Sequence, residues 1–105
     1  MTIRLDPENN ETAALMGAAG SFAGLRVLEI GCGDGRQTFR YATEATKVIA
    51  IDPNAEKIER ARRATPPRLA KRVDFQAASL EDFYTAWRSN PRRQRFDLAL
   101  LSWSL

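Results

Sequence analysis

The glycine-rich turn at residues 31–35 (GCGDG) constrains this 105-residue chain more than any other part of its sequence. It stands between an apolar run at 26–30 (RVLEI) and a helix-like stretch at 36–44 (RQTFRYATE). Glycines at such a turn permit positive φ and let a ligand approach the bare backbone. The helix that follows presents free N–H groups and a partial positive charge. The pattern therefore predicts a ligand-binding turn; the alternative is a tight turn with a surface Glu29.

Short apolar runs alternate with helix-like stretches along the whole chain. The predicted strands are 26–30, 47–51, 73–77 and 96–102, and the predicted helices are 11–19, 36–44, 55–64 and 80–88. Strands that are separated by helices run parallel, because the crossover returns the chain to the same edge of the sheet. Most of these strands are nearly all apolar, as expected when helices cover both faces. The sequence predicts an α/β fold with a doubly wound parallel sheet.

Asp52 ends the second predicted strand, 21 positions after Gly31. Neighbouring parallel strands bring their carboxyl ends together, so Asp52 should lie beside the glycine turn. A carboxylate there can accept both hydroxyls of a ribose; the alternative is a cap for the helix at 55–64. The dinucleotide fingerprint needs a glycine where Arg36 stands, which argues against a nicotinamide-dependent oxidoreductase.

Four segments of the chain resemble the class I S-adenosylmethionine-dependent methyltransferases. They are RVLEIGCGDGRQTFRYA, VIAIDPNAEKIERAR, DFQAASLEDF and FDLALLSWSL. The resemblance implies a Rossmann-like sheet with strand order 3-2-1-4, truncated relative to a seven-stranded fold. It also implies an N-terminal helical lead-in at 1–24 and a partial methyltransferase domain at 25–105 that binds S-adenosyl-L-methionine.

The resemblance further assigns a set of cofactor-binding residues: Glu29, Gly31, Cys32, Gly33, Gly35, Asp52, Pro53, Ser79, Leu80 and Ser102. By this resemblance, one group of them would hold the methionine part of the cofactor. Glu29 and the backbone of Gly31 and Gly33 belong to that group, and Ser102 would lie near the methyl group. Cys32 is a frequent filler at its position in the family, and we expect an inert thiol there.

The adenosine part of the cofactor would lie against the other residues of this set. Asp52 would bind the ribose hydroxyls, and Pro53 would lie near the adenine. Ser79 and Leu80 match the position that contacts the adenine edge, where many family members have Asp rather than Ser. Trp103 matches a position close to the substrate in many relatives.

Composition excludes several kinds of chemistry. The chain has no His and one Cys, so imidazole catalysis, His-ligated metal sites and internal disulfides are excluded. No apolar run approaches the roughly 18 residues of a spanning helix, and the first residues carry no export signal. We therefore expect a cytoplasmic protein that does not contact the membrane.

Charge is uneven along the chain. Residues 1–52 carry a net charge of −2 and residues 53–105 a net charge of +5. A basic segment can attract nucleic acid, but no aromatic residues interleave the basic clusters, so a small-molecule acceptor is favoured.

The sequence as a whole predicts a methyltransferase that positions donor and acceptor for direct displacement; we assign no catalytic base and no metal site. The alternative is a truncated, non-catalytic module that binds S-adenosylmethionine or S-adenosylhomocysteine and lacks an acceptor pocket. Strand 96–102 would be a bare apolar edge, through which the chain would pair with a second copy or a partner chain.

Overall fold

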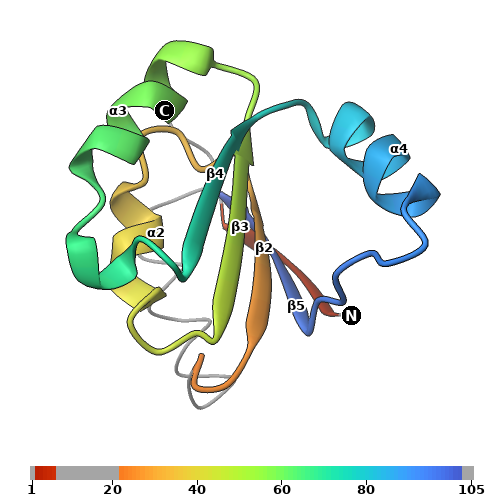
Figure 1. The fold of residues 1–105 in the computed structure, drawn as a ribbon, viewed down its shortest axis with the longest axis horizontal. Coiled ribbons are helices and arrows are strands. Elements are labelled where there is room, and N and C mark those ends of the chain that lie inside the picture. Colours follow the sequence, from red (N-terminus) through yellow and green to blue (C-terminus); the bar gives the residue numbers. More distant parts are fainter. Residues whose placement is uncertain (1, 7–21, 103–105) are drawn as a thin grey trace.

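The computed structural model describes the backbone of residues 2–6 and the whole of residues 22–102 (Figure 1). In chain order its elements are β1 (Thr2–Asp6), β2 (Arg26–Ile30), α2 (Arg36–Tyr41), β3 (Lys47–Asp52), α3 (Ala55–Ala64), the 3-10 helix η1 (Pro67–Leu69), β4 (Val73–Ala77), α4 (Leu80–Ser89) and β5 (Leu98–Ser102). The predicted strands and helices from residue 26 onward are confirmed to within three residues at each end. The predicted helix at 11–19 lies outside the described residues.

The strands form one parallel sheet in the order β1-β5-β2-β3-β4. Four of them, β4-β3-β2-β5, reproduce the predicted order 3-2-1-4. Ile30 at the end of β2 is opposite Ile51 of β3 on one side and Leu101 of β5 on the other. The register therefore brings the carboxyl ends of the three central strands to one edge of the sheet.

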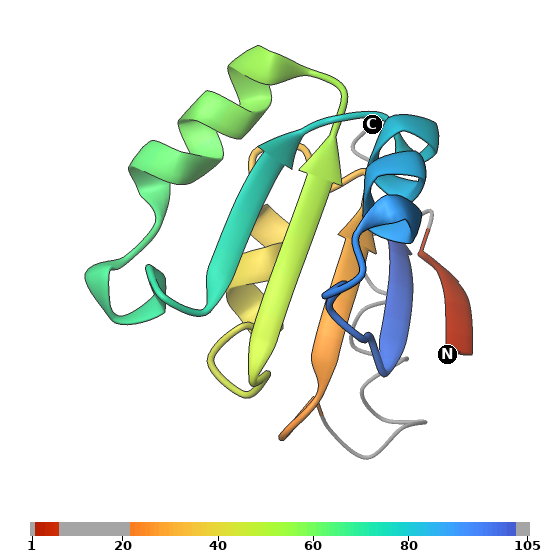
Figure 2. The ribbon, with the colours of Figure 1, turned by 45° about the vertical axis from the view of Figure 1, so that its right-hand side comes forward.

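The first strand of the sheet was not predicted from the sequence. β1 pairs in parallel with β5, from Thr2 opposite Leu98 to Asp6 opposite Ser102 (Figure 2). The expectation that β5 is a bare edge is wrong, because β5 lies between β1 and β2 with both of its edges paired. The suggested pairing of chains through that edge loses its structural basis.

Helices cover both faces of the sheet, with α2 and α3 on one side and α4 on the other (Figure 1). Side chains alternate along each strand, so β3 sends Val48 and Ala50 to one face and Ile49 and Ile51 to the other. The α2–α3 face holds the larger core cluster, to which β4 contributes Phe75.

The α4 face of the sheet is packed more loosely. No residue of α4 is fully buried, although Phe83 packs against the smaller core cluster. Trp87 is half-buried and contacts the segment that follows its own helix. Among the helices in residues 22–102, none has the length and apolar character to cross a membrane.

Deletion of residues 1–6 should destabilise the chain and promote its self-association. Each ladder hydrogen bond contributes roughly 1 kcal/mol net, so we expect the free energy of unfolding in urea to fall by about 2 kcal/mol or more. The exposed β5 edge should then pair between chains, which light scattering would detect as oligomers. A control with residues 1–6 replaced by a Gly/Ser run of equal length should behave like the deletion. Unchanged stability in both variants would argue against the β1–β5 pairing.

Candidate functional site

The glycine turn folds over the end of β3. Gly31 and Cys32 both donate their N–H groups to the carbonyl oxygen of Ile51, at 2.8 and 3.1 Å. Gly31 and Gly33 have φ of 81° and 58°, in the left-handed region that glycine adopts without steric cost. The predicted turn between a strand and a helix is therefore confirmed, and the carboxyl end of β3 holds it in place.

Gly31 is also in close contact with β5. A Cβ atom at this position would overlap the carbonyl oxygen of Ser102, so no other residue fits without a shift of the backbone. Ser102 itself is only 6% exposed, and its hydroxyl has no hydrogen-bond partner within residues 22–102. A buried hydroxyl without a partner is costly, and a polar ligand group at this edge would satisfy it.

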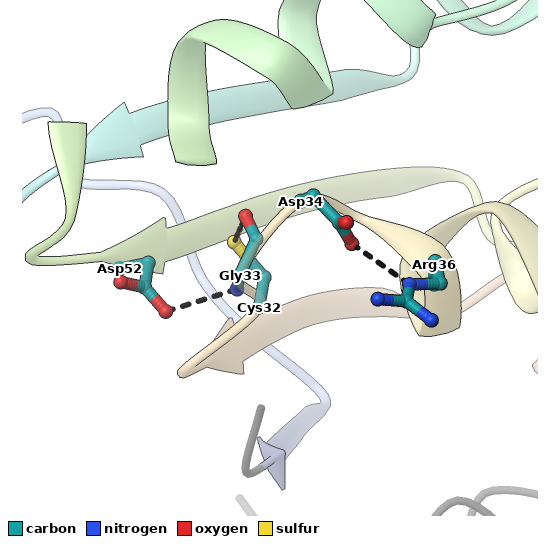
Figure 3. A network of polar contacts seen from close by, with 5 residues as sticks. All are labelled: Cys32, Gly33, Asp34, Arg36 and Asp52. Atoms are coloured by element: carbon teal, nitrogen blue, oxygen red, sulfur yellow. Dashed lines mark hydrogen bonds and ion pairs between the residues drawn. The ribbon is translucent and has the colours of Figure 1, made fainter. Parts of the chain in front are cut away.

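Asp52 connects the glycine turn to the start of α3. Its Oδ2 accepts a hydrogen bond from the N–H of Gly33 at 2.9 Å (Figure 3). Its Oδ1 accepts one from the N–H of Asn54 at 2.8 Å. The predicted position beside the turn is confirmed. The alternative role as the cap of α3 is wrong, because Asn54 accepts from the N–H of Lys57 and caps that helix. Each carboxylate oxygen of Asp52 retains lone pairs that can accept further hydrogen bonds.

Glu29 faces the interior rather than the open edge. Its carboxylate is fully buried, and Oε1 accepts hydrogen bonds from the Thr38 hydroxyl at 2.5 Å and the Tyr41 hydroxyl at 2.6 Å. Both hydroxyls belong to α2, so this carboxylate fastens α2 to β2 beneath the turn. Sequence reasoning missed Thr38 and Tyr41, whose i, i+3 spacing on one helix face was the available signal.

Cys32 and Gly35 pack against the core of the α2–α3 face. The Cys32 side chain belongs to the larger core cluster. Burial raises the pKa of its thiol far above the usual range, and the Glu29 and Asp52 carboxylates add to the shift. The thiol therefore stays neutral, as the inert interpretation predicted. Gly35 has a φ of 89°, and a Cβ there would lie 2.9 Å from the Phe75 ring.

The remaining predicted residues follow the ends of β3 and β4. The N–H of Ala78 donates to the Asp52 carbonyl at 3.0 Å, which brings the start of α4 beside the end of β3. Ser79 caps α4, and its Oγ accepts from the N–H of Asp82 at 3.1 Å. Leu80 and Pro53 are exposed. The edge thus combines the partly exposed backbone of Gly31, a carboxylate, a hydroxyl and an apolar surface, which suit a ligand that combines polar groups with a flat ring.

Comparisons with known proteins agree with this geometry. Residues 21–104 match the family described as "Methyltransferase domain". The magnesium-protoporphyrin O-methyltransferase of Rhodobacter capsulatus is 28% identical over 81 residues, which are 77% of this chain. The mitochondrial ubiquinone biosynthesis O-methyltransferase of Rattus norvegicus is 36% identical over 62 residues, which are 57% of this chain.

A solved structure shares the fold. The magnesium protoporphyrin IX methyltransferase of Synechocystis PCC 6803, determined with bound SAM, superposes with a TM-score of 0.65 at 20% identity. The match covers 89% of this chain and 41% of that structure. The aligned regions make up 36% and 18% of the two sequence relatives, so the chain corresponds to a minor part of their length.

Replacement of Gly31 by Ala should destabilise the chain far more than the same change at Gly24. Both residues have positive φ, which costs an Ala roughly 1–2 kcal/mol. A Cβ at Gly24 meets nothing within 4 Å, whereas at Gly31 it overlaps the Ser102 carbonyl. We expect Gly31→Ala to cost about 1–3 kcal/mol beyond Gly24→Ala in urea unfolding. Equal costs would show that the turn and β5 are not in contact.

The Cys32 thiol should resist labelling in the folded chain. At pH 8, Ellman's reagent should react slowly with native protein and at once with protein in urea, where the single thiol is exposed. Above about pH 8.5 the thiol of the unfolded chain ionises and that of the folded chain does not. The free energy of unfolding should therefore fall as the pH rises, and Cys32→Ala should flatten that dependence. Rapid labelling of the native chain would contradict the burial.

Proposed function

We propose that this chain, which belongs to the methyltransferase-domain family, binds S-adenosylmethionine along the carboxyl edge of its sheet. S-adenosylmethionine is the cofactor of the class I S-adenosylmethionine-dependent methyltransferases to which this family belongs. The observation that carries the proposal is the placement of Asp52. Its carboxylate joins the glycine turn to the end of β3 and keeps lone pairs for a pair of ribose hydroxyls.

In this proposal the other residues of the edge contact different parts of the ligand. The glycine turn at Gly31 and Gly33 would bind the methionine part, close to the hydroxyl of Ser102 that has no partner within residues 22–102. Pro53 and Leu80 would lie against the adenine. Glu29 would act indirectly, since its bonds to α2 hold that helix under the turn.

Little catalytic machinery is needed for this chemistry. The bound cofactor supplies a methyl group that its sulfonium already activates. The chain's contribution is to orient the donor and exclude water, and orientation alone lowers the barrier substantially. A soft or already ionised acceptor would not require a general base, and none is proposed.

We also propose a small-molecule acceptor and a cytoplasmic location. The relatives named for magnesium-protoporphyrin and for ubiquinone biosynthesis support the acceptor class. The alternative is a module that binds the cofactor without an acceptor pocket of its own.

Replacement of Asp52 by Asn should weaken binding of S-adenosylhomocysteine by about 10- to 100-fold in calorimetry, because a hydrogen bond to a charged group contributes roughly 1.5–3 kcal/mol. Asp74→Asn removes the same charge from an exposed strand residue that is also hydrogen-bonded, and should leave the affinity unchanged. An analogue without the two ribose hydroxyls separates recognition from damage to the turn. Wild type should discriminate against it strongly, and Asp52→Asn should not.

Three outcomes distinguish the alternatives. If Asp52→Asn weakens both ligands equally, Asp52 only maintains the turn, and its role toward the ribose is wrong. Absence of binding at millimolar S-adenosylhomocysteine would reject both the methyltransferase and the module. Binding without turnover of phenol and catechol acceptors would favour the module.

A further inference from the structure

A hollow of about 490 Å³ lies on the connection between α4 and β5, away from the glycine turn. The residues that line it are Trp87, Pro91, Arg93, Arg95 and Phe96. α4 begins at the carboxyl edge of the sheet, and the chain then returns to the amino end of β5 (Figure 2). The hollow is therefore built from different residues than the glycine turn and lies towards the other end of the strands.

Aromatic rings form one wall of this hollow. The indole N–H of Trp87 donates to the carbonyl oxygen of Gln94 at 2.6 Å, which fixes the ring against the loop. Phe96 lies 6.3 Å from Trp87 and Tyr84 lies 6.0 Å from it, both between ring centroids and both tilted by about 30°. Tyr84 lies outside the hollow and is 50% exposed, whereas Trp87 and Phe96 line it and are each partly exposed, so aromatic surface remains accessible to a ligand at this wall.

Arginines surround the same wall. The four that belong to this stretch are Arg88, Arg92, Arg93 and Arg95, and all are exposed. The guanidinium carbon of Arg93 lies 5.3 Å from the centroid of the Trp87 ring, a cation–π contact. Within residues 22–102 none of the four forms an ion pair with an acid, although the charge of Arg95 acts on the neighbouring Asp97, which is itself bonded to Arg26. Most of the positive charge of the stretch is therefore available to a ligand.

We propose that this hollow binds a nucleoside phosphate, with the base against the rings of Trp87 and Phe96 and the phosphate on Arg93 and Arg95. One guanidinium group can donate two parallel hydrogen bonds to two oxygens of a phosphate. Nucleic-acid bases stack on aromatic side chains and on arginine. The volume is that of a small-molecule site and accommodates one nucleotide. An acidic peptide would bind the arginines but would make no use of the aromatic rings. A nucleotide would contact both the arginines and the rings, so it fits the hollow better.

The fold corrects one element of the sequence interpretation here. The sequence interpretation was that no aromatic residues interleave the basic clusters, which argued against nucleic acid. The structure brings Trp87 from the helix and Phe96 from the end of the loop to the same arginines. The proposal concerns binding and not methylation of the nucleotide, so it does not depend on the function proposed for the glycine turn.

The test uses the full chain and a fluorescein-labelled, single-stranded RNA of 12 nucleotides, followed by fluorescence anisotropy. Arg93→Ala/Arg95→Ala should weaken binding at least tenfold. The matched control is Arg60→Ala/Arg63→Ala, which removes two exposed charges from α3 and should change the affinity less than twofold. An abasic oligonucleotide with the same phosphates should bind at least fivefold more weakly than the RNA, since stacking contributes roughly 1–3 kcal/mol per base.

Competition with AMP and UMP identifies the source of the nucleotide. Displacement of the RNA by either at micromolar concentration would indicate a site for free nucleotides. Displacement only by unlabelled RNA would indicate that the hollow binds one nucleotide of a single strand, and both results support the proposal.

Equal losses of affinity in the two double variants, or equal affinity for the abasic strand and the RNA, would overturn the proposal. Displacement by a polyglutamate peptide as effective as by RNA, or no binding of the labelled RNA to the wild-type chain, would also overturn it. If Arg93→Ala/Arg95→Ala does not fold, the exposed pair Arg88→Ala/Arg92→Ala should show a loss of at least threefold.

Discussion

The hydrogen bonds at the carboxyl end of β3 are the interaction on which the proposed site depends. The Ile51 carbonyl accepts from two residues of the glycine turn, and the Asp52 carboxylate accepts from a third, Gly33. The Asp52 carbonyl accepts from Ala78 and so secures the exit of β4. Two adjacent residues therefore assemble the turn after β2 and the start of α4 into one continuous edge. Loss of these bonds would separate segments that are distant in the sequence.

The residues around the turn fall into two groups, those in the core and those at the ends of the strands. Glu29 and Cys32 point into the core, where one bonds α2 and the other fills space. Asp52 and Ser102 are the last residues of β3 and β5 and place polar atoms at the carboxyl edge of the sheet. By the alternation of side chains, Glu29, Asp52 and Ser102 all belong to the α2–α3 face of the sheet. Glu29 differs because it stands one residue before the end of β2, where the hydroxyls of α2 reach it. The two hydroxyls of α2 that donate to Oε1 of Glu29 offset part of the cost of burying this carboxylate.

The two ends of α4 are chemically different. Its first residues lie at the edge that carries the glycine turn, and its last residues lead into an arginine-rich loop with a fixed indole. Because no residue of this helix is fully buried, its side chains are available to ligands or to further polypeptide. On the opposite face of the sheet, α2 and α3 cover the larger core cluster (Figure 1). The nucleotide site proposed above lies on this α4 side of the sheet.

Local patterns in the sequence determined the order of strands and helices, the parallel sheet, the glycine turn and the position of Asp52 beside it. These features depend on periodicity, on turn chemistry and on the geometry of parallel strands, all of which act over short stretches. Which strand covers β5 was decided only by the tertiary structure, since β1 reaches it from the other end of the chain.

The inward orientation of Glu29 and the seat of Trp87 beside Gln94 were also decided by the tertiary structure. Asn54, rather than Asp52, caps α3 for a related reason: the Asp52 carboxylate is already bonded to Gly33, 19 residues earlier in the chain. A side chain's hydrogen-bond partner is whichever group the packed chain brings within reach. The sequence alone therefore shows that a residue is polar and where its strand ends, and the fold decides what it bonds.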